Sequence, residues 1–274
     1  MTTITEYAAS RELMANLTLR ELRAKYKRSL LGWAWSLLNP LATMMVFTLV
    51  FGYILKVQPP QGDPSGIKNF ALFLLCGLLP WNYLTSGVGG AIGNLLANAN
   101  LVQKTYFPRD LLVASLVASC LTSFLIEMGL LCVGLLILGN MVLPYIPLAL
   151  LLIVVLTLFV TGLGLAFSVL NVYFRDVQHL VTIMFQVWFY MNPIVYPITL
   201  VPEKTKVLGI EVPARTIYEL NPMVGFVEAF RDLLYHLRMP PAGDLAYLLA
   251  VSSLVFAGGM AIFAKLEGRL AEEL

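Results

Sequence analysis

Long apolar stretches separated by short polar ones dominate this sequence. Six of them are long enough to form membrane-crossing helices: Leu37–Leu55, Phe70–Asn98, Leu112–Leu138, Pro144–Leu170, Leu180–Tyr196 and Leu245–Ala264. A helix of roughly 20 apolar residues spans the hydrocarbon core of a bilayer, which is about 30 Å thick. Backbone groups in lipid must find partners within their own helix, so the pattern predicts an all-α polytopic membrane protein with six transmembrane helices.

The N-terminal segment contains no such stretch. Leu13, Leu17, Leu22 and Tyr26 recur at roughly helical spacing among charged residues. This spacing indicates a helix that lies on the membrane surface. We therefore expect residues 1–36 to form an amphipathic interface helix ahead of the first span.

A basic cluster lies in the second half of this segment. The residues predicted to contact the membrane interface are Arg23, Lys25, Lys27, Arg28, Trp33 and Trp35. Lysine and arginine favour the cytoplasmic headgroups, and tryptophan rings favour the boundary between headgroups and acyl chains. Asn39–Pro40 is expected to let the chain change direction where it enters the bilayer. A basic anchor with no further role is the alternative interpretation of the cluster.

Residues 198–243 carry many charges and come between the fifth and sixth stretches. Within them, residues 221–237 place seven apolar side chains on one helical face: Met223, Phe226, Val227, Phe230, Leu233, Leu234 and Leu237. Glu228, Arg231 and Asp232 interrupt this segment, which is also short for a span. We expect an outer amphipathic or re-entrant helix here. The whole chain then forms one membrane domain, with spans 1–5 in residues 37–197 and span 6 in residues 244–266.

The distribution of positive charge predicts the orientation. Six spans place both termini on one side, and the short loops and termini of that side hold eleven of the 18 lysines and arginines. Short loops rich in lysine and arginine stay in the cytoplasm. Both termini are therefore predicted to be cytoplasmic.

Composition and motifs exclude several functions. The chain is 59% hydrophobic and 12% charged, with a mean hydropathy of +0.80, which excludes a soluble domain. It contains no phosphate-binding G-x-x-x-x-G-K-S/T loop, no H-E-x-x-H zinc helix and no G-x-S-x-G elbow. Its three cysteines lack metal-ligand spacing. We expect no catalytic residue, metal, cofactor or nucleic-acid partner for this chain.

A few residues within the spans are candidates for a translocation path or gate. Glu127 lies near the middle of the third stretch, where an ionisable group is costly and often functional. A hydrogen-bonded packing role for Glu127 is the alternative. Trp81 and Tyr83 fit interfacial aromatic belts, but aromatic faces also stack on sugar rings. Phe230 is a candidate for the gate because the outer helical segment presents it near the exit.

Small residues at four-residue spacing indicate close helix packing. Gly89 and Gly93 in the second stretch, and Ala114 and Ala118 in the third, have this spacing. Such residues let helix backbones approach each other within a membrane. We expect these positions to pack within one subunit rather than between two.

Four segments together carry a family resemblance. The run K-Y-K-R-S-L-L-G-W-A-W-S-L-L-N-P-L at Lys25–Leu41 resembles the N-terminal signature of ABC-2 type permeases that export polysaccharides and polyol phosphates. The segments Tyr106–Arg109, Tyr173–Asp176 and Asn221–Arg231 resemble other recurrent segments of that family, in the same order and spacing. The chain looks most like the teichoic acid branch, with O-antigen or capsular polysaccharide export as the alternative within the family.

The resemblance implies the partners. It implies a homodimer in the bacterial cytoplasmic membrane, two copies of a separate ABC ATPase that bind ATP and Mg, and a polymer on undecaprenyl pyrophosphate. Two polar islands between spans, with the N-terminal helix, are the structures that an ATPase in water can push. The residues predicted to couple to it are Tyr106, Phe107, Arg109, Asp110, Arg175 and Asp176. Ordinary positive-inside loops are the alternative interpretation of the two polar islands. For the whole chain, the alternatives are export of another substrate, such as a drug, and a membrane-embedded glycan-modifying enzyme.

Overall fold

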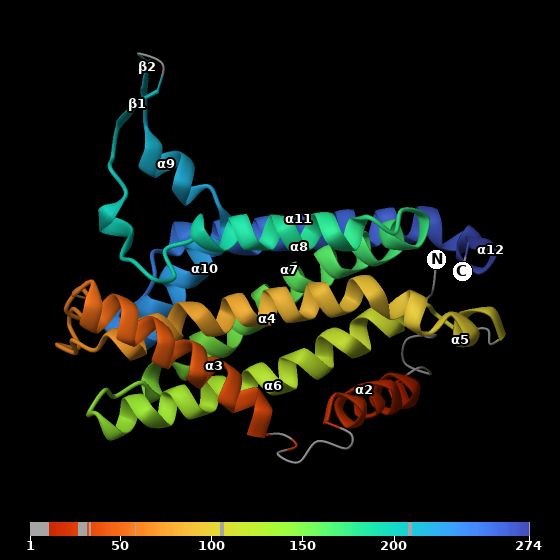
Figure 1. Cartoon of the computed structure of the whole chain (residues 1–274), viewed down its shortest axis with the longest axis horizontal. Helices are drawn as coiled ribbons and strands as arrows, with labels where there is room; N and C mark the ends of the chain where they lie inside the picture. The colour runs from red at the N-terminus through yellow and green to blue at the C-terminus, as the bar shows by residue number, and fades with distance from the viewer. Residues whose placement is uncertain are drawn as a thin grey trace.

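The computed structural model describes residues 11–26, 32, 34–57, 59–104, 107–207 and 210–273. In these ranges the chain forms a bundle of helices with one small hairpin (Figure 1). The longer helices are α2 (Arg11–Tyr26), α3 (Ala34–Phe47), α4 (Phe70–Ala97), α6 (Asp110–Ile137), α7 (Ile146–Tyr173), α8 (Val177–Tyr190), α10 (Pro222–Arg231) and α11 (Ala242–Leu266). The shorter elements are η1 (Thr48–Ile54), α5 (Ala99–Lys104), η2 (Leu143–Tyr145), η3 (Ile198–Leu200), β1 (Thr205–Val207), β2 (Ile210–Val212), α9 (Ala214–Glu219), η4 (Asp232–His236), η5 (Glu267–Arg269) and α12 (Leu270–Glu273). The prediction of a helical fold is confirmed apart from the hairpin.

Five segments of the described residues are long and apolar enough to cross a membrane. They are Leu37–Ile54, Phe70–Ala97, Asp110–Ile137, Leu143–Tyr173 and Ala242–Leu266. They agree with the first four predicted stretches and the last one to within a few residues. Local signals explain the boundaries: the Asn69 side chain accepts the Leu72 backbone N–H at the start of α4, and Gly139 adopts a φ of 86° just after α6.

The fifth predicted stretch forms a shorter helix than expected. Helix α8 has 14 residues, which is about 21 Å at 1.5 Å per residue, against a hydrocarbon core of about 30 Å. The chain leaves the helix at Met191, and the Asn192 side-chain amide donates to the Trp188 carbonyl at 2.5 Å. Helix α8 alone is therefore too short to cross a membrane of this thickness without local thinning of the bilayer or help from the following residues.

The predicted change of direction at Asn39–Pro40 is wrong. Helix α3 begins at Ala34 and continues through Pro40. A proline removes one backbone hydrogen bond from a helix, and helices in apolar surroundings tolerate this when neighbouring groups satisfy the freed carbonyl. The helical segment therefore starts before the proline rather than after it.

Helix α7 lies at the centre of the bundle and packs against α4, α6, α8 and α11. A close approach between α7 and α11 involves two glycines. A Cβ added at Gly259 of α11 would lie 2.0 Å from the carbonyl oxygen and 2.9 Å from the Cα of Gly162 in α7. Only glycine at these positions lets the two backbones come this close.

The glycines singled out in the sequence do not make such contacts. A Cβ added at Gly89 or Gly93 would meet no other atom within 4 Å. The expectation that Gly89 and Gly93 pack closely within the subunit is therefore wrong. Four-residue spacing identifies a helix face with small residues, but it does not say whether another helix lies against that face.

The two ends of the bundle have different structures. At one end, here called the η4 end, the loop of residues 59–69 is held against η4: Tyr235 donates to the Pro60 carbonyl at 3.0 Å, and Ser65 donates to the Tyr235 carbonyl at 2.6 Å. Asn140, after α6, donates to the Leu234 carbonyl at 2.7 Å. Strands β1 and β2, paired antiparallel with Lys206 opposite Glu211, stand away from the bundle here together with α9 (Figure 1).

The opposite end, here called the α5 end, contains α5 and the C-terminal helix α12 (Figure 1). A second hydrophobic cluster lies here, separate from the main core, and includes Leu17 of α2, Val102 of α5 and Leu270 of α12. Helix α2 runs beside α6 and buries Leu17 and Leu22. Residues 11–26 thus form a helix whose buried leucines pack on protein, and its position on the membrane surface stays a prediction.

Candidate functional site

The first predicted coupling loop is joined to the C-terminal tail. Arg109 donates a hydrogen bond from Nη1 to the Glu267 backbone carbonyl, and Phe107 packs half-buried against the second cluster. Asp110 is 8% exposed in the first turn of α6, where an acidic side chain favours the helix N-terminus. Tyr106 lies outside the described residues. The described part of this loop is therefore held against the rest of the protein by the Arg109 hydrogen bond and by the packing of Phe107.

The second predicted coupling loop is more exposed. Arg175 and Asp176 are exposed, and no ion pair joins either of them to another described residue. The neighbouring Tyr173 hydroxyl donates to the Leu266 carbonyl at 2.9 Å, which connects this loop to the same tail.

Phe174 is the functional candidate that sequence reasoning missed. Its side chain is 66% exposed at the C-terminal end of α7, beside Arg175. An exposed aromatic next to an arginine is typical of the residues that dominate protein–protein contacts. The sequence contains the signal, because Phe174 lies in a polar island, but only the structure shows that Phe174 points outward while Phe107 is half-buried.

The predicted membrane-interface cluster is spread over several environments. Arg23 is exposed, and Lys27, Arg28 and Trp33 lie outside the described residues. Lys25 donates from Nζ to the Ser123 hydroxyl at 3.1 Å. Ser123 lies at the middle of the 28-residue helix α6, so α2 carries a basic side chain deep along the bundle. Trp35 is 45% exposed at the start of α3.

Lys25, Trp35 and Glu127 border a polar cleft of about 620 Å³ between α2, α3, α4 and α6. We call this the polar cleft. The polar side chains that line it are Lys25, Asn39, Thr43, Asn82, Tyr83, Thr85, Ser86, Ser123 and Glu127. Its volume is within the range of small-molecule sites in proteins. Glu127 thus borders a cavity and is not enclosed among packed side chains.

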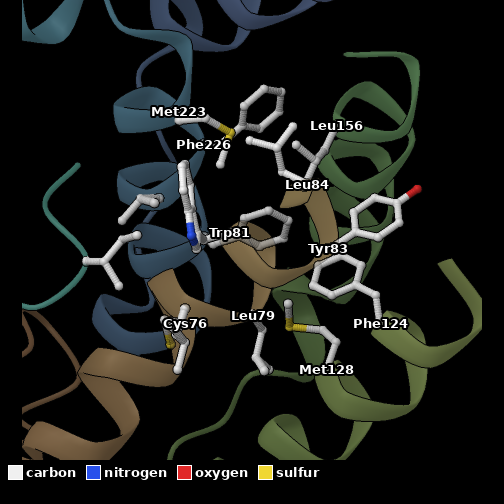
Figure 2. Packing of buried hydrophobic residues seen from close by; sticks show 14 of the residues in the cluster. Cys76, Leu79, Trp81, Tyr83, Leu84, Phe124, Met128, Leu156, Met223 and Phe226 are labelled. Carbon is white, nitrogen blue, oxygen red and sulfur yellow. The ribbon is translucent and has the colours of Figure 1, made fainter. Parts of the chain in front are cut away.

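Tyr83 and Phe230 belong to the packed core. The Tyr83 ring stacks on the Phe124 ring (Figure 2). The two ring centroids are 4.8 Å apart, and the Tyr83 hydroxyl donates to Thr157 at 3.0 Å. Phe230 is fully buried and meets the Phe124 ring edge-on at 6.3 Å. Tyr83 contributes one edge to the polar cleft, whereas Phe230 contacts only other protein groups in this conformation.

Trp81 borders a second groove, of about 460 Å³, between α4 and α8. We call this the α4–α8 groove. It is lined by Trp81, Thr85, Gly89, Thr182, Phe185, Gln186, Phe189 and Tyr190. The Trp81 ring meets Phe185, Trp188 and Phe189 edge-on at 5.6 to 6.0 Å. Aromatic faces, a carboxamide and hydroxyl groups therefore line one exposed side of the bundle.

Helix α10 is enclosed more completely than its pattern predicts. Six of the seven predicted apolar positions are buried, but so are Arg231 and Asp232 on other sides of the helix. The Arg231 side chain is 0% exposed and donates to Glu228 at 2.8 Å and to the Ile194 carbonyl at 2.8 Å. Buried charges persist where such partners satisfy them. The segment is therefore buried on more than its apolar face, and its place at the outer surface of the membrane or within it stays a prediction.

Comparison with known proteins extends over almost the whole chain. A profile of the family described as ABC-2 type transporter matches residues 12–235. The chain is 29% identical over 265 residues to the O-antigen export system permease protein RfbA of Myxococcus xanthus, covering 96% of both chains. It is 31% identical over 270 residues to the protein of the same name from Klebsiella pneumoniae, covering 96% of this chain and 95% of that one. The polysialic acid transport protein KpsM of Escherichia coli is 26% identical over 252 residues, covering 90% of both.

The family match includes all four sequence segments that carry the resemblance, and the first relatives match the chain nearly end to end. These relatives are named as permeases of export systems, which agrees with the membrane-crossing helices. The chain is a multi-pass membrane subunit of a transporter rather than an enzyme, and it belongs to the ABC-2 type transporter family.

Proposed function

We propose that this chain is the permease subunit of an ATP-driven exporter of a bacterial surface polysaccharide of the O-antigen or capsular type. The similarity over 96% of the chain to O-antigen export permeases is the observation that carries the proposal. Similarity to a polysialic acid transport protein extends it to capsular polymers. These relatives favour O-antigen or capsule over teichoic acid, the branch that the sequence motifs indicated first.

The α4–α8 groove is the proposed wall of the translocation path. Its aromatic side chains offer flat faces for sugar rings, and Gln186, Thr182 and Thr85 offer hydrogen-bonding groups beside them. The groove lies on an exposed side of the subunit, where a second copy of the chain would close it. A homodimer would then enclose a path lined on both sides by the same residues.

The proposed membrane arrangement has six crossings with both termini in the cytoplasm. The α5 end is the cytoplasmic end, and α8 provides the fifth crossing together with the residues that follow it. Helix α10 and η4 then form a re-entrant segment at the outer end. Support comes from two buried charges, Arg231 at the end of α10 and Asp232 at the start of η4, which have protein partners at 2.8 and 2.7 Å, as charges inside a membrane protein require.

The proposed energy source is a separate ABC ATPase, bound as two copies at the α5 end. The chain has no phosphate-binding loop of its own, so ATP and Mg would bind to that partner. Phe174 and Arg175 offer the exposed anchor, while Arg109 and Tyr173 connect both loops to the C-terminal tail. A push on one loop would therefore move the other. The proposed substrate is the polymer linked to undecaprenyl pyrophosphate.

Complementation tests this proposal. The chain, expressed with its ABC ATPase partner in cells that lack their own O-antigen or capsule permease, should restore surface polysaccharide measured by antibody binding to intact cells. Thr182→Val and Gln186→Leu in the α4–α8 groove should reduce surface display at equal membrane abundance. Thr122→Val, a matched change on α6 outside the groove, should not. Polymer that stays inside the cell despite a stable permease–ATPase complex would overturn the proposal.

A further inference from the structure

Two Asn-Pro sequences meet where helix α8 ends and helix α10 begins. Asn192–Pro193 comes just after α8, and Asn221–Pro222 starts α10. The Asn221 side-chain amide donates to the Asn192 side-chain oxygen at 3.0 Å and to the Met191 carbonyl at 3.2 Å. One side chain therefore joins the start of α10 to a segment that lies 29 residues earlier in the chain.

The oxygen of the same carboxamide accepts two hydrogen bonds. It accepts the Met223 backbone N–H at 3.1 Å, which caps the first turn of α10, and the indole N–H of Trp188 in α8 at 3.0 Å. A carboxamide has two N–H donors and can accept two hydrogen bonds, so Asn221 uses all four. Capping a helix requires only one of them. The other three connect α10 to α8 and to the residues that follow α8.

Trp188 supports the aromatic wall of the α4–α8 groove. Its ring meets the Trp81 ring edge-on with 5.6 Å between centroids, and it stacks on the Phe185 ring at 6.2 Å. Trp81 and Phe185 are both lining residues of the groove. Aromatic pairs have preferred relative orientations, so a displacement of the Trp188 ring would also displace these two rings.

The two ends of α10 are held differently. Arg231 at its C-terminal end is fully buried and donates to the Ile194 carbonyl at 2.8 Å. Asn221 at its N-terminal end is half-buried, and α9 ahead of it exposes Ile217 by 54% and is followed by Leu220, which is 61% exposed. The N-terminal end of α10 is therefore the end that can shift together with residues 198–220.

We propose that Asn221 is a positioning residue that couples residues 198–220 to the aromatic wall of the α4–α8 groove. While its hydrogen bonds are in place, Trp188 holds Trp81 and Phe185 in position to pack on a sugar ring. When the start of α10 moves away from α8, Trp188 loses its partner and the wall rearranges. This role rests on the proposed function, because it takes the groove to be the wall of the path. It adds a residue outside the groove that sets the shape of the groove.

Two substitutions separate this role from helix capping. Asn221→Asp keeps the shape and the acceptor oxygens, but it removes both donors and places a carboxylate oxygen against the acceptors of Asn192 and Met191. Asn221→Ser keeps a capping oxygen but removes the whole carboxamide. Aspartate and serine are both good N-cap residues, so α10 should remain folded in each variant. Asn69, the N-cap of α4, supplies the matched controls Asn69→Asp and Asn69→Ser.

Fluorine NMR of the full chain in lipid nanodiscs tests the coupling. 5-Fluorotryptophan replaces the four tryptophans, and single Trp→Phe variants assign their signals. Asn221→Asp and Asn221→Ser should shift the signals of both Trp188 and Trp81, while the signal of Trp35, at the start of α3, should stay in place. The Asn69 variants should leave all three signals unchanged. An effect confined to the cap of α10 would not move the Trp81 signal.

The complementation assay measures the consequence for export. Asn221→Asp should lower surface display about tenfold at equal membrane abundance, because it removes two hydrogen bonds that each contribute a factor of about three. Asn221→Ser remains informative if Asn221→Asp fails to fold. Normal surface display by both variants, despite shifted signals, would overturn the inferred role.

Unchanged Trp188 and Trp81 signals in the Asn221 variants would also overturn the inference, and so would equal shifts in the Asn69 variants. If either result occurs while the unaltered chain restores surface polysaccharide, only the role of Asn221 fails. If the unaltered chain does not restore surface polysaccharide while the Asn221 variants shift both signals, the coupling stands and the proposed function fails.

Discussion

Replacement of Arg231 by methionine should destabilise the protein strongly. The guanidinium group is fully buried, and its central carbon lies 3.6 Å from the centroid of the Phe73 ring. It donates to Glu228 and to the carbonyls of Ile194 and Phe73 at 2.8, 2.8 and 3.4 Å. One side chain thus joins α10 to α4 and to the segment that follows α8.

The magnitude follows from these contacts. Removing one partner of a buried ion pair costs about 3–5 kcal/mol, and a desolvated cation–π contact contributes about 2 kcal/mol. The Glu228 side chain is 26% exposed, so water can solvate its carboxylate after the change and reduce the cost. We expect Arg231→Met to lower the free energy of unfolding by about 3–4 kcal/mol. Arg231→Lys, which keeps the charge but loses the planar fork, should cost roughly half as much.

Unfolding of the purified chain in mixed micelles, titrated with a denaturing detergent, measures this difference. Arg215→Met is the matched control, because Arg215 and Glu219 form an ion pair at 3.2 Å with side chains that are 31% and 50% exposed. Such a surface pair contributes about 1 kcal/mol or less. A double-mutant cycle with Glu228→Gln isolates the pair itself. If Arg231→Met costs no more than Arg215→Met, the reasoning about this buried charge is refuted.

Three further predictions concern other parts of the molecule. Gly259→Ala should lower the free energy of unfolding by about 1–3 kcal/mol, because the added methyl group would overlap the Gly162 backbone. Gly258→Ala is the control, because a methyl group there meets open space, and equal effects of the two changes in the same titration would contradict the packing argument. Phe174→Ala should weaken binding of the ATPase by about 30-fold, as loss of an anchor worth about 2 kcal/mol implies, while Tyr53→Ala, 78% exposed in η1, should leave it unchanged in the same pull-down titration. Burial lowers the pKa of His236 from 6.5 to about 4, and Arg238 and Arg231 act in the same direction, so the unfolded chain binds more protons between these pKa values. The contribution of neutral His236 to the free energy of unfolding should be fully present above about pH 6.5, and the free energy should be about 1 kcal/mol lower at pH 5 after allowance for solvent screening. A His236→Gln variant with the same pH dependence of unfolding would exclude His236 as the cause.

The sequence alone identified the five helices that are long and apolar enough to cross a membrane, and the family. Apolar length identifies the spans because a bilayer of fixed thickness demands it, and Asn69 and Gly139 mark boundaries through local backbone chemistry. The motif at Asn221–Arg231 is one of the four segments that together indicated the family, even though the burial of its arginine was not foreseen. These signals come from residues that are close together in the chain, so they can be recognised in the sequence alone.

Only the tertiary structure decided which faces of the helices are in contact. In a soluble helix the polar side faces water, but a membrane helix is apolar on both its lipid-facing and its core-facing sides. Periodicity therefore could not say that Gly162 and Gly259 touch while Gly89 and Gly93 do not. For the same reason, the sequence could not show that protein surrounds α10 on several sides.

The candidate sites depend on contacts between residues far apart in the chain. Lys25 reaches Ser123, 98 residues away, and Arg231 reaches Phe73, 158 residues away. The sequence supplied Glu127, Trp81 and the two polar islands as candidates, but it gave no way to know that Glu127 borders the polar cleft and Trp81 the α4–α8 groove. Packing of distant segments creates these cavities, and the free energy that selects the packing is shared among many side chains rather than encoded at any one position.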